Sequence, residues 1–201
     1  MADPQVRIGR KMATNLGRLR ALDVPDLPVP DELSGYELVD GELAPVMPSK
    51  RRHSWLAFRL SLRLEAHVQE ARAGAVYPDV WCRLNLSYDP ERLRAPDVAF
   101  FGHEKLAEAG DAEIFPSAPD LVVEVHSPTN RKHPGDFQQR VRDYLDAGAA
   151  LLWVVYPDAR YAMMHWPDGR ARMLREHEAL DGDEVLPGLT VALGELFEGM
   201  P

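Results

Sequence analysis

Two short apolar segments each place a carboxylate where it could take part in chemistry. One is Ala95-Pro96-Asp97-Val98-Ala99-Phe100-Phe101, and the other is Pro119-Asp120-Leu121-Val122-Val123-Glu124-Val125-His126-Ser127-Pro128. Side chains alternate between the two faces of a strand, so Glu124 and His126 share a face with Val122. An isolated carboxylate on a buried face costs several kcal/mol of desolvation unless it is paired. The pattern therefore predicts a partner for Glu124.

Asp97 is a residue that could lie next to Glu124. If its strand lies beside the strand of Glu124, the two carboxylates converge, and like charges at close range either raise one pKa sharply or hold a divalent cation. A hard ion such as Mg²⁺ suits two carboxylates, a backbone carbonyl and water, and it can activate water and offset charge on a phosphate. The alternative is structural: Asp97 ends a turn after Pro96, and Glu124 lies at a strand edge bonded to an arginine.

The charge of the chain limits what it can bind. The 201 residues hold 23 Lys+Arg and 32 Asp+Glu, which gives a net charge of −9. This is the wrong sign for a protein that coats nucleic acid, so any DNA contact must be local. Residues 1–20 hold five basic residues and one acidic residue, and form a basic arm before an acidic body. The arm is either a solvated tail or a segment that contacts phosphates.

Several classes of protein are excluded by composition and motif. Cys82 is the single cysteine, so no intramolecular disulfide can form. No histidine stands at a spacing from it that would indicate a Cys–His catalytic pair, so a nucleophilic role is not expected. The longest uncharged apolar run, residues 147–157, is shorter than the roughly 20 residues of a membrane span. The N-terminus lacks the apolar stretch of a secretory signal, so we expect a reducing cytoplasm. The chain has no G-x-S-x-G elbow, P-loop or Cys/His zinc pattern.

The elements that would position the two carboxylates begin with a hairpin and a long helix. Tyr36 to Val46 predicts two short strands around Asp40-Gly41. His53 to Ala73 shows both an alternating and a four-residue apolar pattern, and its length favours a helix closed by Gly74. Four β-prone runs follow and are predicted to be strands of one sheet: Ala75–Val80, Cys82–Leu86, Pro96–Phe101 and Leu121–Val125.

The rest of the chain continues this alternation. Asp136 to Ala147 predicts a helix with Asp136 as N-cap and Gly148 beyond its end. Leu151–Tyr156 is apolar on both faces, as a central strand would be, and a hairpin is expected around residues 167–170. The fold class is therefore α/β or α+β, with helices packed on a central sheet. We expect residues 1–33 to form the basic arm and a Pro-rich lead-in, and residues 34–201 to form one domain.

Several recognisable segments follow one another along residues 34–198: Tyr36-Glu-Leu-Val-Asp-Gly-Glu-Leu, His53, Pro96-Asp-Val-Ala-Phe, Pro119-Asp-Leu-Val-Val-Glu-Val-His-Ser-Pro-Thr-Asn-Arg131, Tyr144-x-x-x-Gly148, Trp153-Val-Val-Tyr-Pro-Asp158, Leu186-Pro-Gly-Leu and Leu196-Phe197. In this order they resemble the Uma family of restriction-endonuclease-like proteins, whose fold is the PD-(D/E)xK nuclease core. The resemblance implies a mixed sheet flanked by helices, an Mg²⁺ or Mn²⁺ site, and hydrolysis of DNA phosphodiesters.

The resemblance also assigns roles to residues. Asp97 and Glu124 would bind the metal with the backbone carbonyl of Val125. The family's lysine is absent from both places where it would be expected, because His126 stands two residues after the glutamate and Arg140 stands four residues before Tyr144. Arg140 can neutralise a phosphate bidentately but cannot act as a base, whereas His126 can deprotonate near neutral pH.

Further residues are secondary candidates for the same site. His53 fits the family's histidine, although a capping or surface role is equally open. Glu37 or Glu42 would add a third acidic group, and Lys132 is the lysine nearest in sequence. A nuclease would also need a positive rim around the carboxylates, for which the candidates are Arg51, Arg52, Arg131, Lys132 and Arg140.

Three hypotheses follow. The first is a cytoplasmic bacterial endonuclease that uses Mg²⁺ or Mn²⁺, with a homodimer as a plausible assembly. The second is a nuclease-fold binding or regulatory module without turnover, because lysine is missing. The third is a metal hydrolase acting on a smaller phosphate ester.

Overall fold

A computed structural model describes residues 19–21, 36–45, 50–127 and 134–201. Its centre is a six-stranded mixed sheet in the order β10-β9-β8-β7-β6-β3. Its strands are β3 (Gly74–Pro78), β6 (Val98–Gly102), β7 (Leu121–Val125), β8 (Leu151–Tyr156), β9 (Tyr161–His165) and β10 (Ala171–Arg175). Strands β7 and β8 are parallel, and the other neighbouring pairs are antiparallel. The mixed sheet predicted from the sequence is confirmed.

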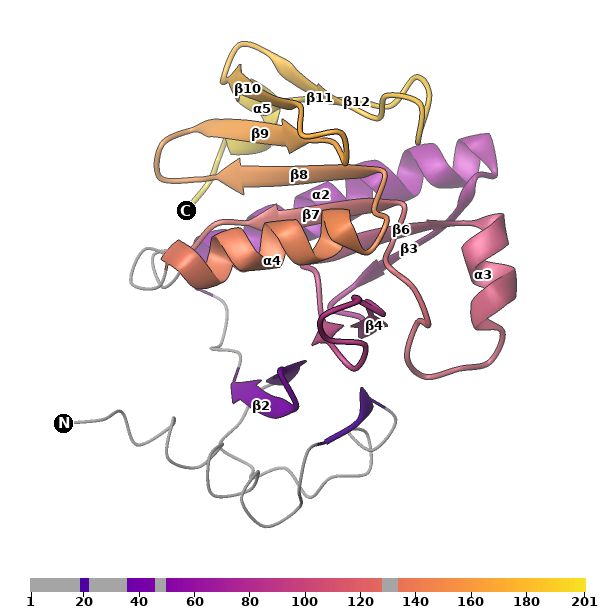
Figure 1. Cartoon of the computed structure of the whole chain (residues 1–201). Coiled ribbons are helices and arrows are strands. Elements are labelled where there is room, and N and C mark those ends of the chain that lie inside the picture. The colour runs from indigo at the N-terminus through magenta and orange to yellow at the C-terminus, as the bar shows by residue number, and fades with distance from the viewer. Residues whose placement is uncertain (1–18, 22–35, 46–49, 128–133) are drawn as a thin grey trace, which may run out of the picture.

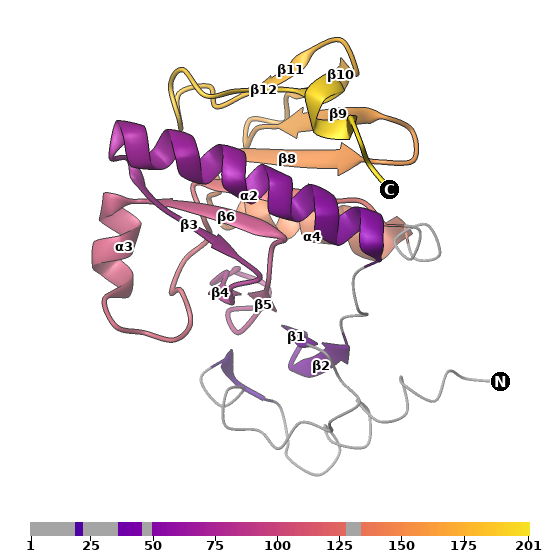
Figure 2. The ribbon, with the colours of Figure 1, turned by 180° about the vertical axis from the view of Figure 1, so that it is seen from behind.

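Helices cover both faces of this sheet (Figures 1 and 2). Helix α2 (Arg51–Ala71) crosses one face and buries four aliphatic side chains spaced by four residues: Leu56, Leu60, Leu64 and Val68. Phe58 and Leu62, the members of the competing alternating pattern, are 63% and 52% exposed. Helix α4 (Pro134–Asp146) covers the other face, where Phe137 and Tyr144 pack on Val122, Leu152 and Val154. The side chains on the two faces of the buried strands thus belong to two separate hydrophobic cores, one under each helix.

The ends of both long helices differ from the sequence prediction. Helix α2 is closed by Arg72 in the left-handed conformation (φ 50°), and Gly74 instead opens β3. The reason is contact: a Cβ at Gly74 would lie 2.0 Å from the carbonyl oxygen of Phe101 on β6, so the glycine is needed in the strand. Helix α4 begins at Pro134, which places Asp136 in its first turn rather than at the N-cap.

A smaller sheet lies below the central one (Figure 1), in the order β2-β1-β5-β4. It comprises β1 (Tyr36–Val39), β2 (Glu42–Pro45), β4 (Cys82–Arg83) and β5 (Leu93–Arg94). Asp40 and Gly41 both have positive φ, as the predicted tight turn requires, so the hairpin is confirmed. The prediction that residues 82–86 join the main sheet is wrong, because the chain turns at Asp79 (φ 46°) and β4 pairs with β5.

The remaining elements complete the two cores. They are α3 (His103–Ala109), β11 (Ala179–Asp181), β12 (Thr190–Ala192) and α5 (Leu193–Phe197). Leu19 and Ala21, from the segment predicted as lead-in, are buried with Leu38 and Leu93 of the small sheet. Most of residues 1–33 lies outside the described part of the chain. Within the described ranges, no helix is both long and apolar enough to cross a membrane.

Candidate active site

Glu124 lies on β7, and Asp97 immediately precedes the neighbouring strand β6. Val98 of β6 pairs with Val123 of β7 in antiparallel register, so continuing this register by one residue beyond the start of β6 sets Asp97 next to Glu124, and the charge of Asp97 acts on the Glu124 carboxyl. Opposed residues of an antiparallel pair project from the same face with Cβ atoms about 5 Å apart. The Val125 N–H donates a hydrogen bond of 2.6 Å to Asp97 Oδ2, which fixes Asp97 at the end of β7. The sheet therefore brings together the two carboxylates that the sequence selected.

Glu124 is a buried carboxylate with too little positive charge around it. The Glu124 residue is only 4% exposed. Burial, with the carboxylates of Asp97 and Glu37, raises the pKa of Glu124 to about 8, because the opposing effect of Arg140 does not cancel them. A second cation near Glu124 would therefore stabilise its ionised form.

Arg140 is held by a third acidic residue, Glu37. Its Nη1 and Nη2 donate to the two carboxylate oxygens of Glu37 at 2.6 and 2.9 Å, whereas Nη1 lies 3.5 Å from Glu124 Oε1. Burial alone would raise the pKa of Glu37, but Arg140 and Arg94 outweigh burial and lower it. The alternative of a helix-to-sheet ion pair between Arg140 and Glu124 is thus present, but it is the weaker of the two contacts of Arg140. Tyr144, one turn along α4, is fully buried beside Glu124.

Glu37 ties this site to the small sheet through buried charges. Arg94 on β5 donates through Nη1 to Glu37 at 2.7 Å and through Nε and Nη2 to Asp143 on α4 at 3.0 and 2.6 Å. Arg92 adds an Nη1 contact of 3.1 Å to the same Asp143 oxygen. Acidic and basic side chains thus alternate in one chain of contacts: Asp143, Arg94, Glu37, Arg140 and Glu124. This network holds Arg140 in place without using its remaining contact with Glu124.

His53 and Asp79 enter the site from the side of α2. His53 Nε2 lies 3.1 Å from Asp97 Oδ2. Burial lowers the pKa of His53, but the hydrogen bond and charge of Asp97, together with Glu124 and Asp79, raise it overall. Asp79 is exposed at the turn after β3, where partial burial and Asp97 raise its pKa. Asp79 is not among the residues predicted from the sequence, because a Pro-Asp turn does not indicate which distant residues lie beside it.

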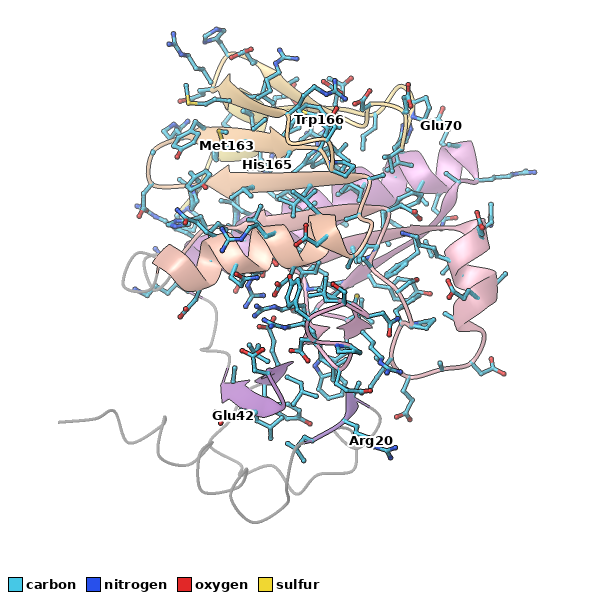
Figure 3. All side chains as sticks on the ribbon, viewed as in Figure 1. Arg20, Glu42, Glu70, Met163, His165 and Trp166 are labelled. Carbon is cyan, nitrogen blue, oxygen red and sulfur yellow. The ribbon has the colours of Figure 1, made fainter. Side chains whose placement is uncertain are left out.

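The other predicted site residues fall in different places. Val125 is buried in β7, and His126 is half-buried after it, with its ring stacked on Tyr156 at 4.8 Å and edge-on to Phe137 at 5.0 Å. Glu42 is exposed on β2, at the outer side of the hairpin (Figure 3), so Glu37 is the hairpin acid that reaches the carboxylates. Arg131 and Lys132 lie outside the described residues.

The donor set suits a hard divalent ion that keeps much of its water. In the described part of the chain, no group of three or more His, Cys, Asp or Glu side chains is arranged to hold a metal. Mg²⁺ is commonly held by one or two carboxylates together with waters and substrate phosphates, so a third protein side chain is not required. Asp97 and the under-neutralised Glu124 fit such an ion.

The fold, a mixed sheet flanked by helices, is that of a restriction-endonuclease-like protein. The family model Uma2, described as "Putative restriction endonuclease", matches residues 23–194, and the chain belongs to this family. The crystal structure of "a putative nuclease belonging to DUF820" from Anabaena variabilis ATCC 29413 has the same fold, with a TM-score of 0.75 at 17% identity. The match covers 89% of this chain and 97% of that one. No curated protein matches the sequence.

Proposed function

We propose that this protein is a divalent-metal-dependent endonuclease that hydrolyses DNA phosphodiester bonds at Asp97 and Glu124. The observation that carries the proposal is the closeness of Asp97, just before β6, to a buried, under-neutralised Glu124 on the adjacent strand β7. Asp97, Glu124 and the Val125 carbonyl would hold Mg²⁺ or Mn²⁺. When bound, such an ion supplies an activated water and offsets charge on the phosphate.

The protein's own side chains would do the remaining work. Glu37 holds the guanidinium of Arg140 at a fixed place beside Glu124, where its charge can act on a phosphate without reorganisation. The imidazole of His53 and the Val125 N–H both contact Oδ2 of Asp97 and would hold this carboxylate in place. His126, whose ring packs on Tyr156 and Phe137, lines the same pocket as His53 and would accept a proton from water.

The direct test is cleavage of plasmid and of labelled single-stranded, duplex and branched DNA with Mg²⁺, Mn²⁺ or EDTA. We expect metal-dependent cleavage by the wild type that is absent from Asp97→Ala. If the wild type cuts none of these substrates faster than Asp97→Ala, the second hypothesis replaces the first. That outcome would point to a binding module without turnover, because the guanidinium of Arg140 is held by Glu37. Cleavage inhibited by mononucleotides would instead indicate a smaller phosphate ester.

Metal binding should be visible without catalysis. Saturating Mn²⁺ is expected to raise the melting temperature by roughly 5–10 °C, since a ligand at 100 times its Kd stabilises the native state by about 2.7 kcal/mol. Thermal unfolding followed by circular dichroism measures the shift. Asp97→Asn should lose the shift and Glu42→Gln, at an exposed carboxylate, should keep it. Equal shifts in both variants would place the metal elsewhere.

Arg140 is expected to act through its positive charge. Arg140→Lys keeps that charge and should retain cleavage within about tenfold of wild type. Arg140→Gln should lose about 10²-fold, the typical effect of removing one donor that stabilises developing charge. Single-turnover rates of the two variants distinguish the outcomes. If both variants cleaved at the wild-type rate, Arg140 would have no role in the mechanism.

The compartment and the assembly are parts of the same proposal. Cys82 is a free, fully buried thiol whose pKa burial raises, as suits a chain in a reducing cytoplasm. Cutting both strands of a duplex would be served by a homodimer, which sedimentation of the purified protein tests.

A further inference from the structure

A pocket of about 270 Å³ opens directly beside the His53–Asp97 pair. It lies between the first turn of α2, the residues after β7 and the residues after β8, and His53 is part of its wall. At roughly 30 Å³ for each water molecule, this is the volume of about nine waters, which is large enough for a phosphate group with part of a sugar. The pocket therefore offers space for a chemical group next to the reacting one.

The lining of the pocket is cationic in a chain that is acidic overall. Lys50, Arg51 and Arg52 stand on one side, and Asp158 is the acidic side chain opposite. Arg52 is engaged, because its Nη1 lies 3.5 Å from Asp158 and its Nε donates to the carbonyl oxygen of Pro201 at 2.6 Å. Lys50 and Arg51 are exposed, and within the described ranges neither forms an ion pair. Two uncompensated cations thus face this pocket.

The backbone at the start of α2 has the same preference for an anion. This 21-residue helix has no side-chain cap at its N-terminus and no acidic residue in its first turn. The first N–H groups of a helix lack intrahelical partners and carry partial positive charge. Since Arg51, Arg52 and His53 form that turn and also line the pocket, the helix end adds to the field of the cationic side chains.

Another part of the pocket wall consists of packed aromatic rings. His126 lines it, and its ring is fixed by the stack on Tyr156 and the edge contact with Phe137. His126 follows Glu124 by two positions, so the same β-segment carries a candidate metal ligand and one wall of the pocket. A ligand in the pocket would lie alongside whatever is bound at Asp97 and Glu124.

We propose that this pocket binds the backbone phosphate of a nucleic-acid strand next to the phosphate that is cut, with Lys50 and Arg51 as its positive contacts. The inference rests on the proposed function, since it assumes that the carboxylate site receives a nucleic acid. It assigns substrate positioning to residues that are not candidate metal ligands. It also explains how an acidic protein holds an anionic polymer: the contact is confined to one cationic pocket beside the reaction centre.

Salt-dependent binding tests this inference separately from catalysis. A fluorescein-labelled 20-nucleotide DNA, single-stranded and duplex, is titrated in EDTA with wild type, with Lys50→Gln/Arg51→Gln, and with Arg172→Gln/Arg175→Gln. The third protein is a matched control, because it also loses two exposed positive charges, on β10 at the far edge of the sheet. Fluorescence anisotropy at several salt concentrations gives Kd and the slope of log K against log salt for each protein.

The pocket variant is expected to bind about tenfold more weakly than wild type, with a slope reduced by about 1, the loss of one phosphate contact. The control should match wild type in both quantities. Equal weakening of the two variants would show a non-local charge effect, and no binding by wild type, or no effect of the pocket variant, would overturn the inference. If wild type binds with these properties but cuts no DNA with metal, the proposed cleavage fails while the phosphate pocket stands. Circular dichroism of each variant verifies folding.

Discussion

Replacing Glu124 with glutamine is expected to slow metal-dependent DNA cleavage by about 10³-fold or more. The substitution keeps the shape of a buried side chain but removes the charge that would bind the ion, and metal stabilisation of a transition state is worth several kcal/mol. Each 1.36 kcal/mol corresponds to a factor of ten in rate. Single-turnover cleavage of a labelled duplex in saturating Mn²⁺ measures the effect.

The same substitution should not weaken the fold, which separates a catalytic loss from unfolding. Glu124 is buried with an under-neutralised charge, so its neutral isostere is expected to leave the metal-free melting temperature unchanged or to raise it. Glu42→Gln is the matched control, since it makes the same chemical change at an exposed hairpin position. Cleavage by Glu124→Gln at the rate of Glu42→Gln would remove Glu124 from the reaction, and a large fall in melting temperature would show that its charge is structural.

The carboxylate pair could be predicted from sequence because its signals are local. Alternation within Leu121–Val125 shows that Glu124 shares the face of buried side chains, and a Pro-Asp turn precedes the neighbouring strand. The antiparallel register of β6 and β7, continued by one residue, then sets Asp97 beside Glu124. The Asp40-Gly41 hairpin was predictable for the same reason, since two adjacent residues with positive φ define the turn.

The surroundings of that pair could not be predicted, because they depend on contacts between distant parts of the chain. Glu37 and Arg140 are 103 positions apart, and Arg94 and Asp143 are 49 apart. No periodicity links such residues, so the sequence left Glu37 and Glu42 as equal candidates. Their burial separates them: β1 turns Glu37 toward α4, whereas Glu42 on β2 is exposed.

Close packing explains the mistaken helix end in a similar way. A glycine after a long apolar pattern is the usual sign of a helix C-terminus. Here Gly74 lies where the backbone of β6 approaches, and the carbonyl of Phe101 leaves no room for a Cβ. Arg72 therefore takes the left-handed conformation that the sequence pattern assigned to glycine. The signal in the sequence was real, but its cause was a neighbouring strand that local patterns do not show.

The buried network is expected to make Asp143→Asn the most destabilising polar substitution in the described part of the chain. Asp143 is fully buried, and its Oδ2 accepts from Arg92 Nη1 and from two nitrogens of Arg94. An amide cannot balance two buried guanidinium groups, and removing one partner of a buried ion pair costs about 3–5 kcal/mol. For a chain of this length the melting temperature should fall by roughly 6–20 °C. Urea and thermal unfolding measure the loss.

Asp146→Asn provides the matched control, because Asp146 lies on the same helix but is exposed, with a single contact of 3.4 Å from Tyr88. Its effect should stay within about 0.5 kcal/mol. Similar losses in the two variants would mean that Asp143 does not organise the network. Arg94 is shared between Asp143 and Glu37, and Glu37 fixes Arg140, so Asp143→Asn should also slow cleavage at temperatures where the variant is still folded. If Asp143 only stabilised helix α4, its substitution would not slow cleavage by the folded protein. Slower cleavage requires the chain of ion pairs that runs from Asp143 through Arg94 and Glu37 to Arg140 beside Glu124.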